Sequence, residues 1–89
     1  MAKKITVMTT PIIIGEDIIQ MIRTNSDRVY CIRSVRDYSN RYHNYWTRVY
    51  KVDDNGHESD KPTYIDFYDK HEDMIAGHSR AVEYMKNKY

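Results

Sequence analysis

Residues 63–85 read TYIDFYDKHEDMIAGHSRAVEYM, and this stretch decides the fold class. Its first part, Thr63–Tyr68, is rich in aromatic residues and alternates, which predicts a strand with Ile65 and Phe67 facing the core. In the second part apolar residues recur every three to four positions, which predicts an amphipathic helix. The apolar stripe of this helix consists of Met74, Ile75, His78, Val82 and Met85, with Ala81 beside it. A strand followed by such a helix is typical of an α+β protein.

Three further strands and a short helix are expected before this stretch. The strands are Lys4–Thr9, Arg28–Arg36 and Tyr45–Val52. The helix is expected over about Glu16–Thr24, because isoleucines recur there at helical spacing behind two acidic residues. No state is assigned to Ile12–Ile14. The order β-α-β-β-β-α predicts a small two-layer α+β fold, an antiparallel sheet of about four strands with a short N-terminal helix and a longer C-terminal helix.

The length of 89 residues fits a single domain spanning residues 1–89. A chain of this size buries only about 60–65% of its unfolded surface, so a large internal cavity is not expected. The single Cys31 cannot form an internal disulfide, lies in an apolar run, and favours a reducing, cytoplasmic compartment. No run of residues in the sequence has the apolar length of a membrane span, so no membrane is expected as a partner.

The net charge of +1 hides a segregation of charge along the chain. Residues 23–51 hold seven basic residues against two acidic ones, whereas residues 52–73 hold eight acidic residues against two basic ones. All but one of the seven basic residues are arginines, which bind carboxylate or phosphate in a bidentate way and stack on aromatic rings. The basic segment is therefore the first place to look for a binding surface.

Tyrosines and a tryptophan are interleaved with these arginines. This combination is found in the hot spots of protein interfaces, and single-stranded nucleic-acid or nucleotide surfaces use it as well. A third interpretation is purely structural, with cross-strand aromatic pairs in a sheet whose solvent face is basic. The candidate binding residues are Arg33, Arg36, Tyr38, Arg41, Tyr42, Tyr45, Trp46 and Arg48.

Catalytic and metal sites are tested by spacing and are not expected. His71 and His78 are two helical turns apart, about 10.8 Å, which is too far for one metal ion without a ligand between them. We expect His78 to be a hydrogen-bonded, partly buried core residue, and Gly77 to mark close approach of another backbone or an aromatic ring. The sequence therefore predicts no catalytic residue, no metal and no cofactor, and a protein that is not an enzyme.

Residues 68–82 resemble the end of small uncharacterised bacteriophage proteins. Those proteins close with an aromatic strand, an acidic helix start, a Gly-His pair and a hydrophobic pair. The resemblance covers the last quarter of the chain, and it departs from the pattern at His71, which stands in place of an acidic residue. It implies a phage origin, and phage genes of this size often encode proteins that bind and block a host or defence component.

Together these patterns predict a non-enzymatic accessory protein in the host cytoplasm. We expect it to bind a host protein or defence component through its Arg/Tyr-rich surface, or to associate with itself. Two alternatives stay open, a nucleotide or single-stranded nucleic-acid binder and a small virion or assembly component. Convergence of the arginines with Tyr42 and Trp46 around a groove favours ligand binding, and scatter over both sheet faces favours the structural interpretation.

Overall fold

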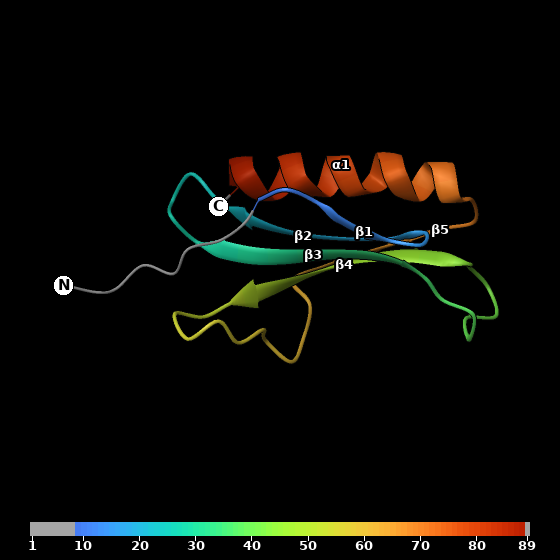
Figure 1. Cartoon of the computed structure of the whole chain (residues 1–89), viewed down its shortest axis with the longest axis horizontal. Coiled ribbons are helices and arrows are strands. Elements are labelled where there is room, and N and C mark those ends of the chain that lie inside the picture. Colours follow the sequence, from blue (N-terminus) through green and yellow to red (C-terminus); the bar gives the residue numbers. More distant parts are fainter. Residues whose placement is uncertain (1–8, 89) are drawn as a thin grey trace.

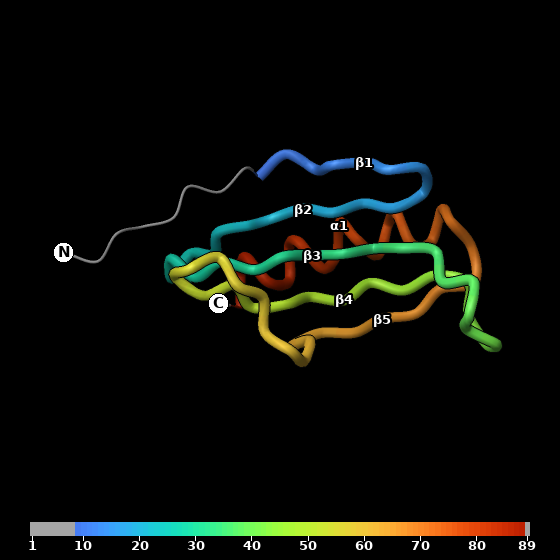
Figure 2. The backbone as a smooth tube through the Cα atoms, turned by 60° about the horizontal axis from the view of Figure 1, so that its bottom comes forward, coloured from blue at the N-terminus to red at the C-terminus, as the bar shows by residue number. Residues whose placement is uncertain are grey.

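A computed structural model describes residues 9–88 and has a five-stranded antiparallel sheet with one helix packed on one face (Figure 1). The elements are β1 (Ile12–Ile14), β2 (Asp17–Arg23), β3 (Val29–Arg36), β4 (Tyr45–Val52), β5 (Tyr64–Tyr68) and α1 (His71–Lys88). Each strand pairs with the next one along the chain, which makes the sheet a meander (Figure 2). The α+β class and the C-terminal helix are confirmed, but the sheet has five strands rather than about four.

The predicted helix over Glu16–Thr24 is wrong, because this segment forms β2. Gly15 has a φ of 61° and, with Glu16, connects β1 to β2 in a two-residue turn that pairs Ile14 with Asp17. The isoleucines that suggested a helix are β-branched, and β-branched residues favour strands. The segment Ile12–Ile14 forms β1, and the predicted strand Lys4–Thr9 lies outside the described residues except for Thr9.

The main core lies between α1 and the sheet. Its buried residues form two groups along the helix. The larger group consists of Ile22, Tyr30, Ile32, Val49, Ala81, Val82 and Met85. The smaller group consists of Tyr45, Tyr68 and Met74. Burying each large apolar side chain contributes about 1.5–3 kcal/mol, so this layer is the main source of stability. Ile75 was predicted in the apolar stripe but is exposed, because it lies one position away from the buried row. Within residues 9–88, no helix has both the length and the apolar character needed to cross a membrane.

The two faces of β5 are the reverse of the prediction. Ile65 and Phe67 are half-exposed on the face away from α1, whereas Tyr68 is buried against the helix. Every second residue of a strand points to the same face, and both sets in β5 are apolar or aromatic, so alternation alone does not choose between them. Gly77 determines which set faces α1. Its lack of a side chain leaves room for the ring of Tyr68 against the helix, since a Cβ at this position would overlap that ring. The expected close approach of an aromatic ring at Gly77 is confirmed.

His78 lies in a buried row of hydrogen bonds between α1 and the sheet. The amide nitrogen of Gln20 donates to the carbonyl of Thr9 at 3.0 Å, so the Gln20 carbonyl accepts from His78 Nε2 at 2.9 Å. His78 Nδ1 then accepts from Ser34 Oγ at 2.7 Å, and Ser34 Oγ accepts from Thr47 Oγ1 at 2.6 Å. Burial lowers the pKa of His78 to about 4, so the ring is neutral at pH 7. The expected hydrogen-bonded core histidine is confirmed.

Candidate functional site

The sheet face opposite α1, here called the helix-free face, is not covered by any helix of residues 9–88 (Figure 1). Its most buried side chains form an apolar cluster of Val29, Cys31 and Val52, with Ile19 and Met21 packed against it. The loop over residues 53–62 folds back toward this cluster, since Glu58 bridges to Val52 and the backbone N–H of Ser59 donates to the Lys51 carbonyl at 2.8 Å. The loop leaves part of the helix-free face open.

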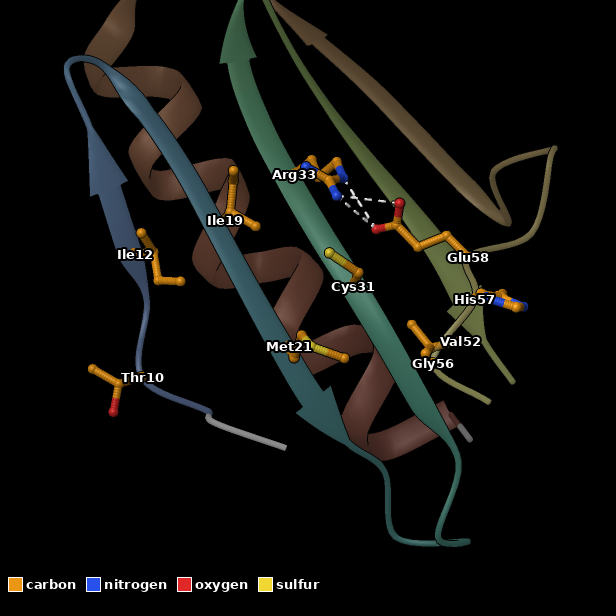
Figure 3. A pocket seen from close by; sticks show the side chains of 10 residues that line it. All are labelled: Thr10, Ile12, Ile19, Met21, Cys31, Arg33, Val52, Gly56, His57 and Glu58. Atoms are coloured by element: carbon orange, nitrogen blue, oxygen red, sulfur yellow. Dashed lines mark hydrogen bonds and ion pairs between the residues drawn. The ribbon is translucent and has the colours of Figure 1, made fainter. Parts of the chain in front are cut away.

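An open pocket of about 790 Å³, here called the sheet pocket, lies on this part of the face (Figure 3). Its apolar wall comes from β1 to β4 and consists of Ile12, Ile19, Met21, Cys31 and Val52. Its polar wall holds Arg33 and, from the loop, His57 and Glu58. A mostly apolar pocket of this size with a few polar groups has the properties of a ligand-binding site.

Two arginines lie side by side next to this pocket, and we call them the arginine pair. Arg33 on β3 and Arg48 on β4 are direct cross-strand partners. Arg33 is bound by both carboxylate oxygens of Glu58, at 3.1 and 3.2 Å. The Arg48 guanidinium lies over the ring of Trp46, 4.0 Å from its centroid, and its Nε has no hydrogen-bond partner within the described residues. Because directly opposed like charges destabilise a sheet, this arrangement carries an electrostatic cost.

The ring beneath Arg48 is held by a second carboxylate. Trp46 Nε1 donates to Asp37 Oδ2 at 3.0 Å, while the other oxygen of Asp37 accepts from the hydroxyl and backbone of Ser39. The hydrogen bonds from Ser39, and then the one from Trp46, hold the pKa of Asp37 below its ordinary value. The indole is therefore fixed in position as a flat support for the arginine.

Arg36 and Tyr45 lie at another place, at the end of the sheet near the start of α1. Glu16 joins them, because Arg36 donates to it at 3.0 Å and the Tyr45 hydroxyl at 2.7 Å. Those two bonds, from Tyr45 first and Arg36 second, hold the pKa of Glu16 below its ordinary value. The Arg36 guanidinium also lies 4.7 Å from the ring centroid of Tyr38. Tyr45 is only 7% exposed, so it belongs to the core rather than to a contact surface.

The remaining candidates, Tyr38, Arg41 and Tyr42, lie in the loop between β3 and β4. Tyr38 and Tyr42 are 84% and 81% exposed, and Arg41 is exposed as well. The structure therefore divides the eight predicted residues among the helix-free face, the group around Glu16 (Arg36 and Tyr45) and this loop. The arginines do not converge with Tyr42 and Trp46 but lie on both faces of the sheet, which for the set as a whole favours the structural interpretation. Of the eight, only Arg33, Trp46 and Arg48 lie on the helix-free face, two of them in direct contact.

The acidic and basic segments of the chain meet in space. Arg33 of the basic segment is paired with Glu58 of the acidic segment. Arg36 and Arg23 are paired with Glu16 and Asp27, which lie outside the acidic segment. Sequence reasoning missed Glu58 and the sheet pocket, because a loop that folds back onto the sheet leaves no local pattern. One available signal was the run of apolar residues on both faces of β2, but that run was assigned to a helix.

Nucleophiles are present but closed off. Burial raises the pKa of Cys31 to about 12, with Glu58 adding to the rise, so this residue is a neutral thiol in the pocket wall. Ser34 and His78 have the spacing of a nucleophile and base, but Ser34 is completely buried. Among residues 9–88, no three His, Cys, Asp or Glu side chains are grouped so that they could hold a metal ion. The helix-free face thus combines the apolar wall of the sheet pocket with the arginine pair.

Comparison of the chain with protein-family models, with curated proteins and with solved structures gave no match. The functional conclusion therefore comes from the chemistry of the helix-free face. Its two parts, the sheet pocket and the arginine pair, share Arg33 and form one continuous surface.

Proposed function

We propose that this protein is a non-catalytic binding protein that holds a protein partner on its helix-free face. An apolar side chain of the partner occupies the sheet pocket, and a neighbouring carboxylate of the partner binds at the arginine pair. The observation that carries this proposal is the pairing of Arg33 with Arg48. Glu58 is bound to Arg33, whereas Asp37, the carboxylate near Arg48, is bound to Trp46 and Ser39, and Arg48 Nε has no hydrogen-bond partner within the described residues.

The arrangement is unfavourable for the isolated chain and favourable for a complex. The N–H of Arg48 Nε is covered and lacks an acceptor within the described residues, which costs about 1–3 kcal/mol, and because it is covered a partner acts on the rest of the guanidinium instead. A carboxylate placed across the arginine pair would accept charge-assisted hydrogen bonds and relieve the repulsion between the two cations. Trp46 presents Arg48 in a fixed position, and arginine with tryptophan is the composition of an interface hot spot.

A protein carboxylate fits this surface better than a nucleic-acid backbone does. Binding along a phosphate backbone requires several cations that are free to meet successive phosphates, with rings between them. Arg23, Arg33 and Arg36 are instead bound to carboxylates of the chain itself. The nucleotide and nucleic-acid alternative therefore has less support from the geometry. The wider expectation, a phage accessory protein that binds a host or defence component, stays a prediction.

Selection from a random peptide library on the immobilised protein tests the proposed recognition. We expect enrichment of peptides in which a large apolar residue is followed or preceded closely by Asp or Glu. Binding of the best peptide should weaken by roughly tenfold or more in Arg48→Gln, which corresponds to one lost charge-assisted hydrogen bond. The matched control is Arg41→Gln, which removes an exposed arginine from the β3–β4 loop and should bind like the wild type.

Two results would overturn the proposal. The first is enrichment of peptides without an acidic residue, and the second is equal peptide affinity of Arg48→Gln and the wild type, with unchanged circular dichroism in both. A parallel measurement addresses the alternative function by fluorescence anisotropy with a labelled single-stranded oligonucleotide. Binding that is tight at low salt and falls steeply as salt rises would favour the nucleic-acid function instead.

A further inference from the structure

The edge of the sheet at β1 is unusually apolar. β1 lies at one edge of the meander, next to β2 (Figure 2). Its residues Ile12, Ile13 and Ile14 are 55%, 70% and 61% exposed. Edge strands present unpaired backbone groups and are normally guarded by charges or covered by other elements. β1 has no charged residue, and no strand of residues 9–88 pairs with its outer side.

The backbone of Ile13 faces away from the sheet. Ile14 and Asp17 close a two-residue hairpin, so they form a hydrogen-bonded pair of the ladder. Hydrogen-bonded and non-bonded pairs alternate along antiparallel strands, so the pair of Ile13 with Ile18 is non-bonded. The N–H and C=O of Ile13 therefore point outward, where only another strand can satisfy both of them in a ladder.

We infer that two copies of this chain pair antiparallel through β1, with a two-fold axis at Ile13. Three identical residues read the same in both directions, so the strand is complementary to itself, as an isologous interface requires. Ile13 would exchange both backbone hydrogen bonds with the partner's Ile13, while Ile12 faces the partner's Ile14. No charged residue occurs from Thr9 to Gly15, so the pairing opposes no like charges.

The other edge of the sheet explains why the pairing closes at two copies. β5 carries Asp66 in its middle, and the Asp66 carboxylate accepts the backbone N–H of Phe67 at 2.9 Å. A charge on an edge strand discourages pairing with a second chain. A contact between β1 of one copy and β5 of another would extend without end, whereas β1 with β1 uses up both reactive edges.

The pairing would also enlarge the binding surface. A two-fold axis perpendicular to the sheet keeps both helices on one side and both helix-free faces on the other. Ile12 pairs with Ile19 and lines the sheet pocket, which lies beside the edge that is joined. The two sheet pockets would therefore be neighbours across the interface, and the dimer would present them as one extended groove.

Light scattering coupled to size-exclusion chromatography over a concentration series tests the inference. We expect the wild type to have a dimer mass that decreases on dilution, and Ile13→Lys to be a monomer with unchanged circular dichroism and with a thermal midpoint that, unlike that of the wild type, does not depend on concentration. The matched control is Ile65→Lys, which places the same charge at a half-exposed position of the other edge strand, β5, and should leave the dimer intact. A monomeric wild type at all concentrations, a dimeric Ile13→Lys, or a mass that grows beyond the dimer would each overturn the inference.

A cross-link tests the geometry directly. In a Cys31→Ser background, Ile13→Cys should oxidise to a covalent dimer, because hydrogen-bonded antiparallel partners have Cα atoms about 5.5 Å apart, within the range of a disulfide. Ile65→Cys in the same background is the control and should stay uncross-linked, and an equal yield from both variants would contradict the two-fold pairing. Peptide binding is measured separately on Ile13→Lys, so the proposed function and the dimer can fail independently.

Discussion

The two faces of this sheet differ in how completely their polar groups are matched. Under α1, the polar side chains of Gln20, Ser34, Thr47 and His78 form one row of hydrogen bonds. On the helix-free face, two arginines lie opposite each other beside an open pocket; Glu58 is bound to Arg33, and Arg48 Nε has no hydrogen-bond partner within the described residues. Neighbouring residues of β3 supply both arrangements, because alternate side chains point to opposite faces. Folding stability comes mainly from the covered face, and the proposed binding uses the helix-free face.

Adjacent residues of β3 give the sharpest test of this division. Ile32→Ala on the covered face should lower the free energy of unfolding by about 2–5 kcal/mol, since it leaves a cavity in the closed core. Cys31→Ala on the helix-free face should lower it by about 1 kcal/mol or less, because the wall of an open pocket leaves no enclosed cavity. Urea titrations of both variants measure the difference, and equal losses would contradict the division.

Acid should weaken the covered face through His78. Its pKa is lowered from 6.5 to about 4, so the unfolded state binds more protons between these values. Stability is therefore complete above about pH 6.5 and should fall by about 3 kcal/mol as the pH drops to 4. Urea titrations at pH 7 and pH 4 measure this loss. His78→Gln should lose this slope, whereas His57→Gln in the pocket wall should keep it.

The smallest expected effect is on the helix-free face. Glu58→Gln should lower the free energy of unfolding by about 0.5–1 kcal/mol, because it removes an ion pair and leaves the repulsion within the arginine pair. The loss should shrink at high salt, since the pair is partly exposed. Asp60→Asn in the same loop is the control and should have no effect. A loss that does not depend on salt would show that Glu58 acts by packing instead.

The parts of the fold whose secondary structure could be predicted are those in which residue propensity and flanking signals agree. β3, β4, β5 and α1 combine strong propensities with turns or a helical stripe. β2 could not be assigned, because Ile18 and Ile22 face α1 while Ile19 and Met21 face the sheet pocket, which leaves no alternation. Gln20 is a polar residue of β2 that faces the core. Its partner His78 lies 58 positions away in the chain, so no local pattern indicates that Gln20 is on the core side.

The candidate site was predictable in composition but not in arrangement. The mixture of arginine and aromatic residues identified Arg33, Trp46 and Arg48, which lie on one face. It also included Tyr45, whose ring is buried near α1, because tyrosine serves equally well in a core and on a surface. Glu58 and the sheet pocket depend on how the loop over residues 53–62 folds back, and that contact joins positions 25 residues apart.

The hydrogen bonds around His78 all run in one direction. Tyr68 donates to Thr47, Thr47 to Ser34, Ser34 to His78, and His78 to Gln20. One residue from each of β2, β3, β4 and β5 takes part, and the row crosses the sheet diagonally, because Ser34 and Thr47 are direct cross-strand partners whereas Gln20 pairs with Ile32 and Tyr68 with Tyr45. An apolar interface alone would tolerate sliding or rotation of the helix by a fraction of a turn. Here such a displacement would break both hydrogen bonds of His78, to Ser34 and to Gln20, so this one helix residue fixes the position of α1 on the sheet.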